Sequence, residues 1–227
     1  MTLESRISRA LVLAPHPDDE VLGCGGTMAR IAASGGIVEV AVVTRGREPR
    51  FKAAQADEVR AEAEEAHALL GVTRTHFLDL PAAELDRIAR ADLNQAIANV
   101  VDKAKPDTLF VPFVGDLHFD HGLVFEAALV AARPRGNGYP RRILAYETLS
   151  ETNWSAPTLS PAFHPNVFID ISEHLETKLR AFACFRSQCR PPPDERSVET
   201  LRALATVRGA TVTRLAAEAY MLIREVG

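Results

Sequence analysis

Short apolar runs alternate with longer amphipathic segments along this chain. Apolar runs of about four to eight residues, bounded by polar or glycine-containing stretches, are typical of strands buried on both faces of a parallel sheet. Such runs occur at 10–14, 37–44, 75–78, 108–113, 143–146 and 167–171. Apolar residues that recur every three or four positions predict helices over 18–34, around 59–70, 93–104, 123–132 and 175–182, and then over 198–208 and 212–224. This alternation predicts an α/β fold.

The length of 227 residues fits one α/β domain, which we expect to span positions 1–227. We expect a Rossmann-like parallel sheet flanked by helices, with the common doubly wound strand order 3-2-1-4-5. In that order strands one and four are neighbours, and ligands bind at the carboxyl ends of the strands. The functional site is therefore predicted where the runs 10–14 and 108–113 end.

Residues suited to metal binding follow both of these strands. His16 and Asp19 follow the first strand in the sequence His-Pro-Asp-Asp-Glu, and His118 and His121 follow the fourth in His-Phe-Asp-His. Residues three apart share a face at the start of a helix, so each pair can converge on one point, while Asp18 points elsewhere. Acids are common in first helical turns because of the helix dipole, and a single histidine is often only hydrogen-bonded. It is the occurrence of both motifs, each after a predicted buried strand, that favours a metal site.

Two imidazoles and one carboxylate with an open position are typical of a catalytic zinc site, and Fe(II) is compatible with the same ligands. Zinc would lower the pKa of a bound water and polarise a carbonyl oxygen. Asp18 could take a proton from that water, and the imidazole left over could stabilise an oxyanion and protonate a leaving amine. Asp120 could orient an imidazole. This set would serve amide hydrolysis, and the Gly-x-Ser-x-Gly motif of serine hydrolases is absent.

Composition narrows the classes of function. The chain has 26 Lys and Arg against 30 Asp and Glu, so its net charge of −4 gives no global basic field for nucleic acid. No apolar run approaches the ~18 residues of a membrane span, and residues 1–6 lack the hydrophobic core of a signal peptide. Three cysteines are too few for a disulfide framework. We therefore expect a cytoplasmic protein with no membrane span and no nucleic-acid partner.

The two motifs resemble those of the LmbE/PIG-L family of zinc-dependent N-acetylglucosaminyl deacetylases. The likeness covers nearly the whole chain and extends through Thr44-Arg45-Gly46, the helix with Arg60, Tyr146-Glu147, 166–171, Ser187-Gln188, Arg208-Gly209 and 217–220. One position departs from the pattern, because Gly122 stands where the family often has arginine.

The resemblance implies a role for each residue of the two motifs. The implied zinc ligands are His16, Asp19 and His121. Asp18 is implied to be the general base, His118 the acid or oxyanion partner, and Arg60 a substrate-binding residue. The implied reaction is zinc-dependent hydrolysis of the N-acetyl group of an N-acetylglucosaminyl conjugate, which releases acetate and a free amine. The resemblance also implies a homo-oligomer.

A cationic loop follows the second strand, at the same edge of the sheet as the predicted metal site. Positions 45–52 carry four cations against one acid, a local reversal of the net charge, although a solvated surface loop can have this composition. Arg45, Arg47 and Arg60 are candidates for binding a negative group on the aglycone side of the sugar.

Two alternative functions stay open. A non-catalytic member of the family could use the cleft only to bind a sugar or metal, but the intact Asp18 and His118 argue against this. A metal-dependent phosphoesterase often has two metals and more carboxylates than can be assembled here.

Overall fold

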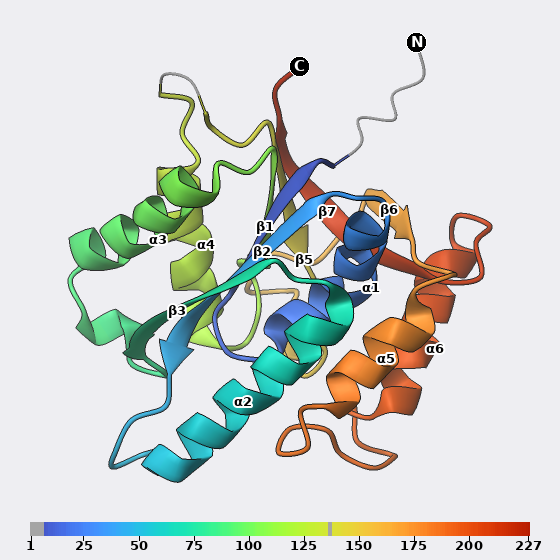
Figure 1. Ribbon diagram of the computed structural model, residues 1–227, viewed down its shortest axis with the longest axis horizontal. Coiled ribbons are helices and arrows are strands. Elements are labelled where there is room, and N and C mark those ends of the chain that lie inside the picture. Colours follow the sequence, from blue (N-terminus) through green and yellow to red (C-terminus); the bar gives the residue numbers. More distant parts are fainter. Residues whose placement is uncertain (1–6, 136–137) are drawn as a thin grey trace.

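A seven-stranded sheet with helices on both faces forms the molecule (Figure 1). The computed structural model describes residues 7–135 and 138–227, so residues 1–6, on which the expectation about a signal peptide rests, lie outside the described part. The strands are β1 (Arg9–Ala14), β2 (Ile37–Arg45), β3 (Arg74–Pro81), β4 (Thr108–Pro112), β5 (Arg142–Tyr146), β6 (Val167–Asp170) and β7 (Ala217–Glu225). The helices are α1 (Asp19–Ala33), α2 (Ala53–Leu70), α3 (Arg90–Ala104), α4 (Phe119–Ala131), α5 (Leu175–Ala183) and α6 (Val198–Ala210), with short 3-10 helices η1 (Leu85–Arg87) and η2 (Thr152–Trp154). No helix within the described ranges has the length and apolar character needed to cross a bilayer.

The strand order is β3-β2-β1-β4-β5-β7-β6. The first five strands in this order are parallel, which confirms the predicted 3-2-1-4-5 arrangement with strands one and four side by side. The sheet departs from the expected parallel arrangement only at one edge of its described part, where β7 runs antiparallel to both β5 and β6.

The prediction of a helix over 212–224 is wrong, since most of this segment is the strand β7. Its alanines, glutamate, leucine and methionine are good helix formers. In the strand, however, Tyr220 and Leu222 pack into the core on one side of the sheet, whereas Met221 and Ile223 pack into the other. Pairing with a strand on each side outweighs helix propensity here.

The sheet separates two apolar cores because successive side chains of a strand point to opposite faces. In β1, Ala10 and Val12 pack with α1, α2 and α5, whereas Leu11 and Leu13 pack with α3 and α4. All four side chains are fully buried, and burying a Val or Leu stabilises a fold by about 1.5–3 kcal/mol. Figure 1 shows the same division, with α3 and α4 on one side of the sheet and α1, α2 and α5 on the other. The central strands are therefore a rigid base for the residues at their ends.

The carboxyl ends of β1 and β4 bring the starts of two helices together. The strands pair with Val12 opposite Phe110, α1 begins soon after β1, and α4 begins at Phe119, four residues earlier than its apolar pattern predicts. Glycine lets α1 approach β5 closely, because a Cβ added at Gly23 would lie 2.3 Å from Tyr146 Cδ2.

Candidate metal centre and active site

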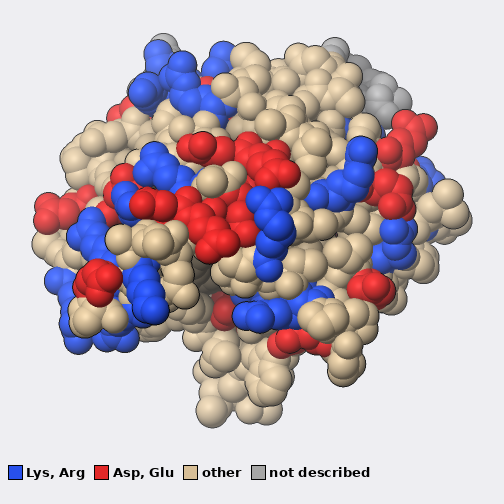
Figure 2. Space-filling view, turned by 60° about the horizontal axis from the view of Figure 1, so that its bottom comes forward, with Lys and Arg blue, Asp and Glu red and all other residues tan. Residues whose placement is uncertain are grey.

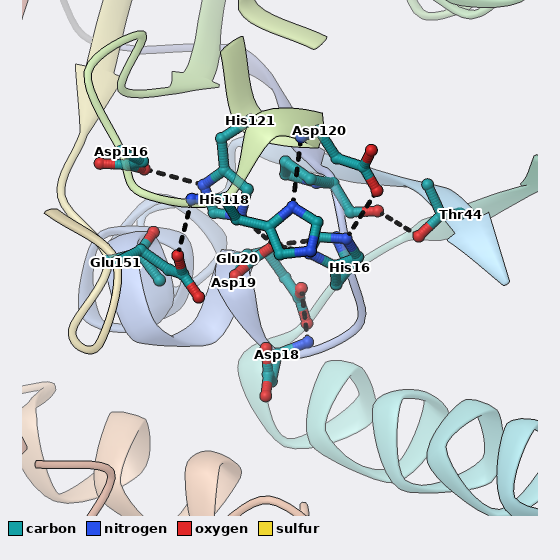
Figure 3. Close-up of polar contacts among 12 residues, drawn as sticks. His16, Asp18, Asp19, Glu20, Thr44, Asp116, His118, Asp120, His121 and Glu151 are labelled. Carbon is teal, nitrogen blue, oxygen red and sulfur yellow. Dashed lines mark hydrogen bonds and ion pairs between the residues drawn. The ribbon is translucent and has the colours of Figure 1, made fainter. Parts of the chain in front are cut away.

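Three side chains converge at the carboxyl end of β1 (Figure 3). Asp19 Oδ2 lies 3.4 Å from His16 Nδ1 and 3.3 Å from His121 Nε2. A tetrahedral zinc ion with bonds of about 2.0–2.1 Å has ligand atoms roughly 3.3–3.4 Å apart. Both distances from Asp19 therefore match that spacing, and the three residues form one of the groups that could hold a metal, with ligand atoms all within 4.8 Å of one another.

Two further carboxylates fix the orientation of the imidazoles. Asp116 Oδ2 lies 2.8 Å from His121 Nδ1, and Asp120 Oδ2 lies 3.1 Å from His16 Nε2. Each carboxylate accepts a hydrogen bond from its imidazole, which leaves a lone pair on the nitrogen that faces Asp19. His121 Nε2 is buried and has no hydrogen-bond partner among the described residues. A cation would satisfy this buried nitrogen and the facing carboxylate together.

The charges of these side chains also favour a bound cation. Burial opposes a positive charge on His121, but Asp19 and Asp116 raise its pKa to about 10. Burial acts in the same way on His16, and its bonds to Asp120 and Asp19 raise its pKa to about 9. Burial tends to raise the pKa of Asp19, yet His121 and His16 hold it well below its usual range. Protons on the imidazoles thus balance the carboxylates, and a divalent ion can take their place.

Asp18 is adjacent to Asp19 in sequence but is directed elsewhere, as the sequence predicts. Its φ of 106° lies in the left-handed region, and its amide donates to Glu20 Oε2 at 3.1 Å. The buried carboxylate is paired with the guanidinium of Arg196, from the segment before α6. Burial raises the pKa of Asp18 to about 7, and Arg196 opposes part of that shift. A carboxylate that gains and loses a proton near neutral pH is suited to general base catalysis.

His118 lies beside the three converging side chains. Its ring centroid is 4.3 Å from that of His16, and its amide donates to Glu151 Oε2 at 3.0 Å. Its Nδ1 accepts the amide hydrogen of Asp120 at 3.2 Å, so the neutral ring carries its own hydrogen on Nε2. Burial, aided by the charge of His16, lowers the pKa of His118 to about 4. At neutral pH this imidazole is therefore an uncharged hydrogen-bond donor.

A cavity of about 470 Å³ adjoins these residues, and Glu151 and Arg196 are part of its lining. Arg45 and Arg60 also line the cavity, whereas Arg47 is absent from the lining found for the described residues. The Arg60 guanidinium carbon lies 3.9 Å from the ring centroid of Phe77. Figure 2 shows acidic side chains gathered in the middle of the molecular face in view, with Lys and Arg side chains around them. Charges of both signs therefore occur there, and the face is not uniformly basic.

Comparison with known proteins decides the family. Residues 11–132 match the family described as PIG-L, GlcNAc-PI de-N-acetylase. The chain is also 30% identical over 196 residues to a diacetylchitobiose deacetylase of Thermococcus kodakarensis, covering 80% of this chain and 70% of the relative. The chain belongs to the PIG-L family.

Other PIG-L relatives agree in sequence and in fold. The uncharacterized deacetylase YaiS of Escherichia coli is 30% identical over 183 residues, covering 78% of this chain and 90% of the relative. The solved structure of an N,N′-diacetylchitobiose deacetylase from Pyrococcus horikoshii superimposes with a TM-score of 0.76 at 25% identity, covering 98% of this chain and 87% of that one. The fold class predicted from the sequence is therefore confirmed, and the chain is an enzyme of a deacetylase family.

The structure brings together all six residues that the PIG-L resemblance and the motifs singled out around the metal. They are His16, Asp18, Asp19, His118, Asp120 and His121. Sequence reasoning missed Asp116, Glu151 and Arg196. Asp116 stands in the same loop as His118, and its spacing of five from His121 is a local signal. Glu151 and Arg196 reach the site only through tertiary packing, so no local pattern points to them.

Proposed function

We propose that this chain is a single-metal, zinc-dependent N-deacetylase that hydrolyses the acetamide of an N-acetylglucosaminyl conjugate to acetate and a free amine. The observation that carries the proposal is the spacing of three ligand atoms, 3.3 and 3.4 Å from Asp19 Oδ2, beside a spare carboxylate and a neutral imidazole. Relatives in the family are deacetylases of N-acetylated amino sugars, including the diacetylchitobiose deacetylase and a 2′-N-acetylparomamine deacetylase of Streptomyces fradiae.

His16, Asp19 and His121 would hold the ion, with Asp120 and Asp116 orienting the two imidazoles. When bound, zinc would supply Lewis-acid polarisation of the amide carbonyl and would acidify a water molecule. Fe(II) suits the same donors.

The residues around the ion have complementary roles in this proposal. Asp18 takes the proton from the attacking water and passes it to the amide nitrogen as the C–N bond breaks. A carboxyl group with a pKa of about 7 suits both transfers. His118 donates its Nε2 hydrogen to the carbonyl oxygen as negative charge develops there. The pKa of about 4 favours this donor role over that of a protonated general acid at neutral pH.

Arg60 and Arg45 are the proposed substrate-binding residues on the far wall of the cavity. Arg60 is held by Phe77 and by Asp79, whose Oδ1 lies 3.4 Å from its Nη1, so its guanidinium presents a planar, fixed edge. Arg45 is paired with Asp57 and is therefore partly neutralised. Arg47 contacts the carbonyl oxygen of Asp79, so its role would be to hold this wall.

The test is release of free amine and acetate by the purified, zinc-loaded protein. N-acetylglucosamine, N,N′-diacetylchitobiose and N-acetylglucosamine 1-phosphate cover neutral and anionic aglycones. We expect equal amounts of amine and acetate from at least one conjugate, and no turnover by Asp18→Asn, which should still bind zinc. Binding without turnover would instead support a sugar-binding module, and release of inorganic phosphate would support a phosphoesterase.

The arrangement of donors disfavours the phosphoesterase. In the described part of the chain two groups could hold a metal, and both include His16, so two ions would need both of its ring nitrogens. In the second group, with His118 and Asp120, the Asp120 carboxylate already accepts the amide of Ala83 at 2.7 Å. A pair of ions bridging a phosphate is thus not supported.

A further inference from the structure

Asp18 does not hold its position through local backbone preference. A non-glycine residue at φ 106° is strained by about 1–3 kcal/mol, so its surroundings must fix it. One restraint is the bond from its amide to Glu20 Oε2, and Glu20 is itself held by His67, 2.9 Å away. This restraint fixes the backbone but leaves the direction of the carboxylate open. In Figure 3 the Asp18 side chain lies away from the imidazoles of His118 and His121.

The second restraint comes from the connector between α5 and α6, residues 190–197. Its turn is closed by a hydrogen bond from Arg190 N to Arg196 O at 3.0 Å, and Ser197 caps α6 by accepting the amide of Thr200. Glu195 accepts the indole hydrogen of Trp154 at 2.6 Å, which ties the connector to η2. The position of Arg196 is therefore fixed from both sides.

The guanidinium of Arg196 lines the cavity together with Asp18. Its Nη2 is paired with Asp18 Oδ2, its Nη1 lies 3.4 Å from Ser150 Oγ, and its side chain is 23% exposed. Its Nε is buried with no hydrogen-bond partner in the part of the chain that the structure describes. A surface ion pair would be worth little, but a guanidinium enclosed in this way fixes the direction of the carboxylate that it contacts.

We propose that Arg196 is a positioning residue of the deacetylation, which directs the Asp18 carboxylate toward the attacking water. The connector 190–197 is then part of the active site, although it lies far from both metal motifs in the sequence. This inference rests on the function proposed above. Positioning of the base, substrate binding and stabilisation of the fold predict different kinetics for variants of Arg196.

The test compares Arg196→Ala, Arg196→Lys and Arg202→Ala in the zinc-loaded protein. Arg202 is the matched control, because it is an exposed arginine of α6 paired with Glu176, away from the cavity. A misplaced catalytic group commonly costs about 100-fold in rate. We therefore expect Arg196→Ala to lower kcat about 10–100-fold with little change in KM or zinc content, and Arg196→Lys to retain part of the activity. Added guanidinium chloride at low, non-denaturing concentration should restore part of the kcat of Arg196→Ala but not raise that of the control.

Three results separate the inference from its alternatives. An unchanged kcat in Arg196→Ala would overturn it, and so would a raised KM at constant kcat, which would assign Arg196 to substrate binding. Arg196 would have only a structural role if Arg196→Ala loses kcat, unfolds at a lower temperature and is not rescued by guanidinium, and if Arg196→Lys retains no activity. If the unchanged chain releases no amine from any conjugate, the proposed function fails instead.

Discussion

Removal of the Asp116 carboxylate, which orients the proposed ligand His121, should weaken zinc binding. The side chains of Asp116 and His121 are both fully buried, with 2.8 Å between Asp116 Oδ2 and His121 Nδ1. Asp116 Oδ1 also accepts the hydroxyl of Thr152 at 2.6 Å. Asp116→Ala would leave His121 Nδ1–H without an acceptor and free the ring to turn. Loss of such a partner typically costs 10–100-fold in metal affinity, which is about 1.4–2.7 kcal/mol. Asp116→Asn keeps an acceptor oxygen and should lose less.

The assay is a competition titration of zinc between the protein and a chelator of known affinity. Asp102→Ala is the matched control, since it removes an exposed carboxylate from α3 and should leave the zinc Kd unchanged. Thermal unfolding of each variant checks that the fold persists. A folded Asp116→Ala protein that binds zinc as tightly as the unchanged chain would refute the role of His121 Nε2 as a ligand oriented by Asp116.

Four further predictions follow from the charges of the described residues. Because His16 and His121 have pKa values of about 9 and 10 without a metal, zinc binding at pH 7 should release about two protons. Calorimetry in buffers of different ionisation enthalpy measures this number, and a release near zero would contradict the role of the two imidazoles as ligands. A histidine whose pKa is raised in the folded state stabilises the fold below its unfolded pKa of about 6.5, and this stability is lost as the pH rises through the folded pKa values of about 9 and 10. These two groups should therefore make the chelator-treated protein easier to unfold with urea as the pH rises from 7 to 10. A free energy of unfolding that rises over this range would refute the raised pKa values of His16 and His121. His118 has a pKa of about 4, so His118→Gln should lower kcat but keep the shape of the pH profile of kcat/KM above pH 5. Loss of the basic limb of that profile would contradict this, because it would show that His118 titrates in the basic range. Lys178→Met leaves the buried Glu218 without the cation that lies 2.5 Å from it, so the free energy of unfolding should fall by about 3–5 kcal/mol and Tm by roughly 6–20 °C. The double variant Lys178→Met/Glu218→Gln should recover part of this loss. A single variant no less stable than the double one would contradict a buried ion pair.

The central strands and the metal motifs could be predicted from the sequence because their signals are local. The buried runs before His16 and His118 are short and apolar, and Pro17 and the acids after them mark the start of a helix. The doubly wound order then brings the two motifs together, and β1 and β4 are indeed neighbours.

The remaining features depend on contacts that no short pattern records. The segment 217–225 has helix-forming residues but is a strand because β5 and β6 pair with it. Glu218 is buried within this strand, where it accepts the amides of Gly26 and Thr27 of α1 and pairs with Lys178 of α5. Arg196 reaches Asp18 in the same non-local way. The cationic loop at positions 45–52 is less positive in the fold than its sequence predicts, because Arg45 is paired with Asp57 of α2, which lies outside the loop.

A zinc titration of the metal-free protein tests the proposed centre most directly. The chelator-treated protein would be mixed with increasing zinc, and free amine released from N,N′-diacetylchitobiose, or from the best substrate in the panel, would be measured at each ratio. One ion held by His16, Asp19 and His121 predicts that activity rises linearly and reaches its maximum at one zinc per chain, and that Asp19→Ala removes both the binding and the activity. Activity in the fully metal-free protein, or a maximum only at two zinc ions per chain, would contradict a single-metal deacetylase at this site.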